Sequence, residues 1–142
     1  MSAIIKSIVA TSFIVTLLLS GRAEADKIDP IVKTLKTSQD YKVRIEAALK
    51  LSKVCDKRAT QALLGALGDT DKTVRGVAAA GLGKIVNGNT GAKIRAAVLN
   101  QLKVAAKKDS NPFVRKQATK AHDRIKNPSS VKKPLCPVAA AP

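Results

Sequence analysis

The stretch Leu67-Gly68-Asp69-Thr70-Asp71-Lys72-Thr73-Val74-Arg75 decides the fold. Within it, Asp71 is a short acceptor side chain that can cap the free backbone N–H groups at the start of a helix. Apolar residues then recur at helical spacing, at Val74, Ala78 and Ile85. The stretch therefore predicts a polar turn that joins two short antiparallel helices.

The Val-Arg pair at the end of this stretch occurs three times, as Val43-Arg44, Val74-Arg75 and Val114-Arg115, at spacings of 31 and 40 residues. With the three pairs in register, apolar columns follow four and eleven residues after the valine. These columns are Ala47, Ala78 and Ala118, then Val54, Ile85 and Ile125. A second apolar stripe lies upstream and consists of three columns. The first column is Ile28, Ala59 and Leu99, the second is Ile31, Ala62 and Leu102, and the third is Leu35, Ala66 and Ala106.

The turn between the two helices is repeated as well. Asp40, Asp71 and Asn111 occupy one column, and Pro112 follows at a first helical position that needs no N–H. The second and third anchors are separated by nine extra residues, which the loop signal at 87–91 and a longer following helix explain. Such a gap is tolerated because each unit of a repeat protein touches mainly its neighbours.

With these features the chain resembles the HEAT-repeat family over roughly residues 27–126. The resemblance implies an all-α fold, a short α-α superhelix (solenoid) of about three HEAT-like helical hairpins. We expect a repeat domain and then an extended, proline-rich tail. The expected boundaries are 26–127 for the domain, with units at about 27–55, 58–87 and 92–126, and 128–142 for the tail.

The chain departs from the family pattern in two places. Ser38 stands where the later turns have Asp69 and Asp109. His122 stands where the earlier units have leucine, which suits a terminal repeat with no successor to pack against. The resemblance also implies that the arginine after each valine pairs with a turn aspartate of its own or an adjacent unit. The expected architectural ladder consists of Arg44, Arg75, Arg115, Asp69 and Asp109.

The N-terminal residues have the order of a secretory signal. Lys6 precedes twelve uninterrupted apolar or small residues at 8–19, and a small-residue exit follows at Ala23-Glu24-Ala25. Twelve apolar residues fall short of the ~20 that span a bilayer, and no cysteine follows where lipid attachment would need one. We expect residues 1–25 to be a signal peptide cleaved near Ala25, which leaves a soluble periplasmic or secreted protein. An uncleaved membrane anchor is the alternative.

Basic residues dominate the chain, whose formal net charge is +16. Removal of residues 1–25 leaves 24 basic and 9 acidic side chains, a charge of +15. Exposed columns of the second helices carry lysines that form a candidate binding face for an acidic partner. These are Lys42, Lys50, Lys53, Lys72, Lys84, Lys116, Lys120 and Lys126. The alternative interpretation is a solvated surface that keeps a repeat protein soluble.

The two cysteines, Cys55 and Cys136, both survive the expected processing. An exported protein meets oxidising conditions, in which this pair can form a disulfide that pins the tail to the end of the first unit. Two unpaired thiols, one packed in the core and one on a loose tail, are the alternative. The sequence supplies no distance, so both interpretations stay open.

Catalytic chemistry is not visible in the chain. His122 is the only histidine, so neither a metal cluster nor a nucleophile with its base can be built around it. Most acidic residues of the expected mature chain lie in turns or caps, and Glu46 is its only glutamate. The scarcity of aromatic residues, 2% of the chain, also argues against binding of single-stranded nucleic acid. We expect no catalytic residue, no cofactor and no metal.

Two functions remain. The leading hypothesis is an exported, non-enzymatic HEAT-repeat protein that acts as a protein–protein interaction scaffold, with an envelope or secreted protein as its partner. The alternative is an electrostatic binder of an acidic polymer or anionic membrane surface through the lysine-rich face. Intracellular nucleic acid is not expected as a partner, because the chain is expected to leave the cytoplasm.

Overall fold

In the computed structural model, residues 27–128 and 135–136 are described. A first helix covers residues 27–37, and five further helices follow. They are α2 (Tyr41–Leu51), α3 (Lys57–Ala66), α4 (Lys72–Ile85), α5 (Ala92–Lys108) and α6 (Pro112–Lys126). The expected signal peptide and most of the expected tail lie outside the described residues.

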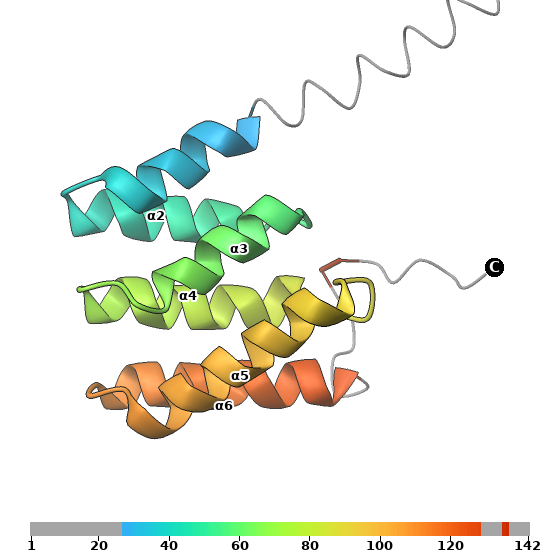
Figure 1. Ribbon diagram of the computed structural model, residues 1–142. Helices are drawn as coiled ribbons and strands as arrows, with labels where there is room; N and C mark the ends of the chain where they lie inside the picture. The colour runs from blue at the N-terminus through green and yellow to red at the C-terminus, as the bar shows by residue number, and fades with distance from the viewer. Residues whose placement is uncertain (1–26, 129–134, 137–142) are drawn as a thin grey trace, which may run out of the picture.

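The helices form two layers. Figure 1 shows α2, α4 and α6 stacked as one layer, with the helix at 27–37, α3 and α5 lying across it as the other layer. Within the stack, α4 contacts both α2 and α6, while α3 packs on α4 and α5 packs on α6. The described part of the chain is therefore an all-helical solenoid of three hairpins, and the predicted fold class is confirmed.

Side chains cap the helices as the turn column predicts. Asp40, Asp71 and Asn111 each accept a hydrogen bond from the backbone N–H two residues later, at 2.8–2.9 Å. Asp56 caps α3 in the same way, at 2.7 Å. Each cap satisfies at least one of the N–H groups that a helix start leaves without a partner, and Asp71 satisfies two. Hence the short polar turns end one helix and begin the next within a few residues.

The core lies between the two layers and consists of aliphatic side chains. The largest fully buried ones are Leu51, Leu63, Leu82, Leu102, Val74, Val98 and Val114. Of the three anchor valines, Val74 and Val114 are fully buried, but Val43 is 38% exposed. Val43 belongs to the first described hairpin, and within the described residues no earlier hairpin covers it. The exposure of Val43 is thus an end effect of a stack in which each unit is buried by its neighbours.

Two predicted columns shift in the structure. In α5, Val98 is fully buried while Leu99 is only half-buried, so the core-facing stripe includes a residue that the alignment missed. A longer connection precedes α5, which has 17 residues against 10 in α3, and the alignment of the anchors does not account for this difference. Val54 lies beyond the end of α2 and is half-buried in the connection to α3.

Glycines on α4 let the neighbouring helices approach closely. A Cβ at Gly83 would lie 2.8 Å from Cα of Ala121 in α6, and one at Gly81 would lie 2.9 Å from Cβ of Ser52. A Cβ at Gly76 would overlap the ring of Phe113. Glycine inside a helix costs about 0.5–1 kcal/mol relative to alanine. The close contacts that α4 makes with both neighbours offset that cost.

Replacing Gly83 with alanine should therefore destabilise the protein. We expect Gly83→Ala to lower the free energy of unfolding by about 1–3 kcal/mol, since the added methyl meets helix backbone that cannot move aside. Urea denaturation followed by circular dichroism measures the change. Gly65→Ala in α3 is the matched control, because a Cβ there meets nothing within 4 Å. The control should gain about 0.5–1 kcal/mol, and equal effects at the two sites would contradict the packing argument.

Candidate functional site

Arginines join the turn of each hairpin to the turn of the next. Arg44 donates from Nε and Nη2 to the two carboxylate oxygens of Asp69, both at 2.8 Å. Arg75 binds Asp109 in the same way, at 2.8 and 3.0 Å. Each carboxylate also accepts the N–H two residues later in its own turn, at 2.8 Å. These planar, two-point contacts fix the position of one hairpin relative to the next.

Arg115 has only half of this arrangement. In all three arginines, Nη1 donates to the backbone carbonyls six and five residues earlier, at 2.8–3.2 Å. Arg44 and Arg75 also bind the aspartate of the following hairpin, whereas Arg115 forms no salt bridge within residues 27–128 and 135–136. The structure therefore brings together four of the five predicted ladder residues as ion pairs and leaves Arg115 at the open end.

Both ladder carboxylates are shielded from solvent, with side-chain exposures of 11% for Asp69 and 8% for Asp109. Hydrogen bonds from Arg75 lower the pKa of Asp109, although burial opposes this. For Asp69, burial is the largest single influence and raises the pKa, but hydrogen bonds from Arg44 and the Asp71 N–H leave it below its usual value. Both aspartates are therefore charged near neutral pH, and they stabilise the fold in that form.

Loss of a ladder carboxylate should lower the free energy of unfolding and weaken the dependence of that free energy on acidic pH. Asp109→Asn leaves the shielded Arg75 unpaired, and we expect a loss on the order of 3 kcal/mol in unfolding free energy at pH 7. Because the folded pKa of Asp109 is below the unfolded one, its contribution is present above about pH 4 and is lost as pH falls through the folded pKa. Denaturation curves for the variant and the wild type should thus converge in acid.

The matched control for this change is Asp29→Asn. Asp29 pairs with Arg58 at 2.8 Å, but the two side chains are 64% and 36% exposed. An exposed pair contributes less than about 1 kcal/mol, so this variant should change stability little. If Asp29→Asn lowered the free energy of unfolding as much as Asp109→Asn does, shielding from solvent would not explain how much the ladder contributes to stability.

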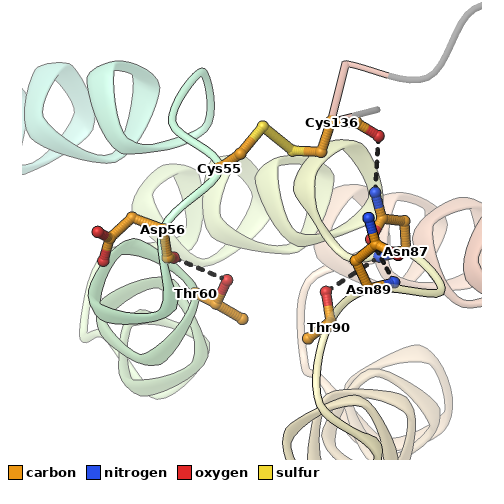
Figure 2. The surroundings of a disulfide bond; sticks show 7 residues. All are labelled: Cys55, Asp56, Thr60, Asn87, Asn89, Thr90 and Cys136. Carbon is orange, nitrogen blue, oxygen red and sulfur yellow. Dashed lines mark hydrogen bonds between the residues drawn. A yellow bond between two sulfur atoms is a disulfide. The ribbon is translucent and has the colours of Figure 1, made fainter. Parts of the chain in front are cut away.

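The structure joins Cys55 and Cys136 by a disulfide, with 5.6 Å between the two Cα atoms and a sequence separation of 81. Figure 2 shows how the bond holds the C-terminal segment over the loop that follows α4. There Nδ2 of Asn87 donates to the backbone oxygen of Cys136, at 2.7 Å. Of the two alternatives that the sequence left open, the structure has the bridged one, and Cys136 is buried.

A cleft of about 490 Å³, lined by both polar and apolar side chains, lies beside the disulfide. Its hydrogen-bonding groups are largely engaged with one another. Thr60 Oγ1 donates to the backbone oxygen of Asp56 at 3.2 Å, and Thr90 Oγ1 accepts from the Asn87 N–H at 3.2 Å. The Asp56 carboxylate binds Arg58 at 3.1 Å. Hydrogen bonding to Arg58 lowers the pKa of Asp56, although burial acts to raise it. The hydrogen-bonding groups of the cleft therefore mainly hold the chain segments around it together.

Opening the disulfide should cost much of the protein's stability. A cross-link that closes a loop of this length restricts the unfolded chain, and its removal costs about 4 kcal/mol in the chain-entropy model. We expect this loss in chemical denaturation when reductant is added, and in the double variant Cys55→Ser/Cys136→Ser without reductant. Reductant should not weaken the double variant further. A double variant as stable as the wild type would rule out a stabilising role for the bond.

The burial of α4 defines the open side of the second-helix layer. Beyond its first turn, only Val77, Ala80 and Lys84 of this helix reach solvent, and Thr73 continues the same strip. The Val-Arg register places four residues of each neighbouring unit beside this strip. They are Lys42, Glu46, Leu49 and Lys53 in the first unit, and Phe113, Gln117, Lys120 and Arg124 in the third. These twelve residues form what we call the outer face.

Cations and exposed apolar side chains share the outer face. Leu49 and Phe113 are each 44% exposed. Lys53, Lys84 and Arg124 occupy equivalent alignment positions and form a row with one cation from each hairpin, although Lys53 lies in the turn just after α2. Lys42 and Lys120 add two further cations, against the single carboxylate of Glu46. Arg124 was not among the predicted binding residues, although it lies in the same alignment column as Lys53 and Lys84.

The eight predicted lysines are all exposed, but they do not share one face. Four of them, Lys42, Lys53, Lys84 and Lys120, lie on the outer face. Lys50 aligns with Gly81, which in α4 is buried against the preceding unit, so Lys50 lies at the N-terminal edge of the stack. Lys116 aligns with Gly76, buried beneath Phe113 of the following helix, so Lys116 lies at the C-terminal edge.

The two remaining lysines also leave the outer face. Lys72 is the first residue of α4, and Lys126 is the last residue of α6 and aligns with the buried Val86. The sequence pattern marks which residues are exposed. In a short stack, however, the sides that another unit would cover are exposed too. For this reason the pattern alone merged residues from three different surfaces into one candidate face.

The described residues hold little catalytic or metal-binding chemistry. Within the described ranges, no three His, Cys, Asp or Glu side chains lie close enough to hold a metal ion. Nδ1 of His122 lies 3.4 Å from a carboxylate oxygen of the adjacent Asp123. Glu46 is exposed on α2. As for membranes, no helix in this part of the chain combines the length and the apolar character that a crossing requires.

Comparison with known proteins agrees with the geometry. A family model described as HEAT repeats matches residues 28–120, a span that begins in the first helix and ends within α6. A search of curated proteins finds no match.

Proposed function

Because the chain belongs to the HEAT-repeat family, we propose that it is an exported, non-enzymatic scaffold that binds another protein through its outer face. HEAT repeats are generally protein-interaction scaffolds. The observation that carries the proposal is the mixed character of this face, where the exposed side chains of Leu49 and Phe113 stand among cations. Apolar anchors surrounded by a charged rim are typical of surfaces that bind proteins.

The rigidity of the stack supports this assignment. The ladder and the glycine contacts hold α2, α4 and α6 in fixed relative positions, so their open strips form one preorganised surface. A partner that binds such a surface loses little free energy in ordering it. The apolar side chains supply contacts that salt screens poorly, while the cations favour a partner whose matching surface is acidic.

Two features support export. Residues 1–25 have the order of a secretory signal, and their expected processing site precedes the first described helix. The disulfide between Cys55 and Cys136 is of a kind that forms and persists in oxidising compartments. We therefore propose that the protein works in the periplasm or outside the cell, with an envelope or secreted protein as its partner.

The acidic residues support a non-enzymatic role. Asp69 and Asp109 are held by the ladder, while Asp40, Asp56 and Asp71 cap helices. These carboxylates already have structural partners. A general acid or base would need a free proton-transfer group beside a substrate cleft.

An electrostatic binder of an acidic polymer or anionic membrane surface is the second candidate. The row of Lys53, Lys84 and Arg124, with one cation from each hairpin, favours it. The two candidates differ in how their affinity depends on salt. Binding to a polyanion falls steeply with salt because bound counterions are released, whereas apolar protein contacts persist.

Affinity capture with the full chain, from an envelope extract of its host, separates the two functions. We expect a defined protein partner that remains bound at ~0.3 M salt. The variant Leu49→Ser should lose this partner, because it removes an apolar contact from the outer face. Val104→Ser is the matched control, since Val104 is likewise 44% exposed but lies on α5, in the other layer.

The opposite pattern would support the second candidate. In that case a heterogeneous catch would wash off with salt, and Leu49→Ser would bind as the wild type does. Reversal of charge at Lys53, Lys84 and Arg124 to glutamate would then abolish binding to anionic vesicles. Retention of the partner by Leu49→Ser at high salt would show that the outer face is not the binding surface.

A further inference from the structure

The open end of the ladder has a binding geometry that is used twice elsewhere in the same chain. Arg44 and Arg75 each anchor Nη1 on two turn carbonyls and bind a carboxylate with Nε and Nη2. Arg115 anchors Nη1 in the same way, at 2.8 and 3.1 Å, but its Nε and Nη2 donate to no group that the structure describes. Neither of these two nitrogens is buried. We propose that Arg115 is a receptor for a carboxylate supplied by a partner protein.

The anchoring of Nη1 makes this receptor preformed. The two carbonyl contacts, to the backbone oxygens of Asp109 and Ser110, restrict the guanidinium plane before any ligand arrives. A fixed guanidinium loses less side-chain entropy on binding than a free one. Its remaining N–H groups match the two oxygens of a carboxylate, as the distances of 2.8–3.0 Å in the occupied copies demonstrate.

The surrounding charge favours an acidic partner segment. Lys116 adjoins Arg115, and Lys120 lies one helical turn beyond Lys116 along α6; both side chains are exposed. Of the nearby carboxylates, Asp109 is already paired with Arg75, and no salt bridge joins Asp123 of α6 to Arg115 among the described residues. Because the local field is positive, a negatively charged segment is attracted and a basic one is repelled.

A fourth repeat packed against α6 is a poor occupant of this edge. Where α4 has Gly76, Ala79 and Gly83 to admit the next helix, α6 has Lys116, Thr119 and Asp123 in the same columns. These longer, polar side chains prevent the close approach that α4 and α6 make. The expected occupant is therefore a carboxylate-bearing turn or loop that docks at Arg115 without packing a whole helix on α6.

A second copy of this chain is also a poor occupant. In a head-to-tail pair, the turn of the first hairpin would have to supply the carboxylate, but Ser38 stands in the position of Asp69 and Asp109. The ladder of one molecule thus cannot continue into the next, which disfavours open-ended association of the repeats. We therefore expect the carboxylate to come from a different protein.

The test uses the full chain labelled with ¹⁵N and follows the Nε–Hε signals of its arginines by NMR. The probe is a synthetic peptide that copies residues 66–75 and therefore carries Asp69, the residue that Arg44 binds within the protein. The matched peptide replaces that aspartate with asparagine. We expect the first peptide to shift the Arg115 signal saturably and to leave Arg44 and Arg75 unchanged, because their Nε groups are occupied. The asparagine peptide should bind at least about tenfold more weakly.

A variant and an inorganic anion complete the test. Arg115→Lys keeps the charge but lacks the planar fork, so it should lose the difference between the two peptides. Since this change also removes a turn contact, its melting temperature is measured alongside, and the peptide pair on the wild type decides the question independently. Equal binding of the two peptides, or an equal Arg115 shift with inorganic phosphate at matched ionic strength, would overturn the proposal. Changes at Leu49 should leave this binding intact, so the result is separable from the function proposed for the outer face.

Discussion

The two-point contact between an arginine of one hairpin and the turn aspartate of the next sets the geometry of the whole stack. Each of these arginines, in its own second helix, contacts the turn of its own hairpin with Nη1 and the turn of the next hairpin with Nε and Nη2. Because each aspartate also holds the N–H two residues later, the contact positions the next helix cap as well. A turn of a few residues thereby fixes both the fold of a hairpin and its place beside its neighbour.

Close packing within the second-helix layer depends on that alignment. The glycines of α4 are useful only if the small residues of α6 and the end of α2 face them, and a shift of one residue would place larger side chains there. The core compensates for its lack of aromatic side chains in this way, since short residues allow helix backbones to approach and bring many aliphatic atoms into contact. The two proposed binding surfaces, the outer face and the end of the ladder, consist of residues outside this packing.

The sequence predicted the repeat architecture well because its signals are local. The Val-Arg pairs, the caps at Asp40, Asp71 and Asn111, and the alanine column each follow from spacing within one hairpin. Features that depend on the distance between hairpins were harder to predict from the sequence. Spacing did not decide whether each arginine binds its own or the next turn, whether the cysteines meet, or which edge Lys50 and Lys116 lie on. Arg124 could have been found by extending the alignment column of Lys53 and Lys84 to the third unit.

The bond between Cys55 and Cys136 also changes the path of mechanical tension through the molecule. It begins just after α2 and ends in the C-terminal segment, so α3 to α6 lie inside the covalent loop and α2 lies outside it. A pull applied to the two chain ends would pass from one sulfur to the other and bypass the last two hairpins. The first hairpin would unravel alone, while the helices bearing Lys84, Arg115 and Lys120 would stay folded under load.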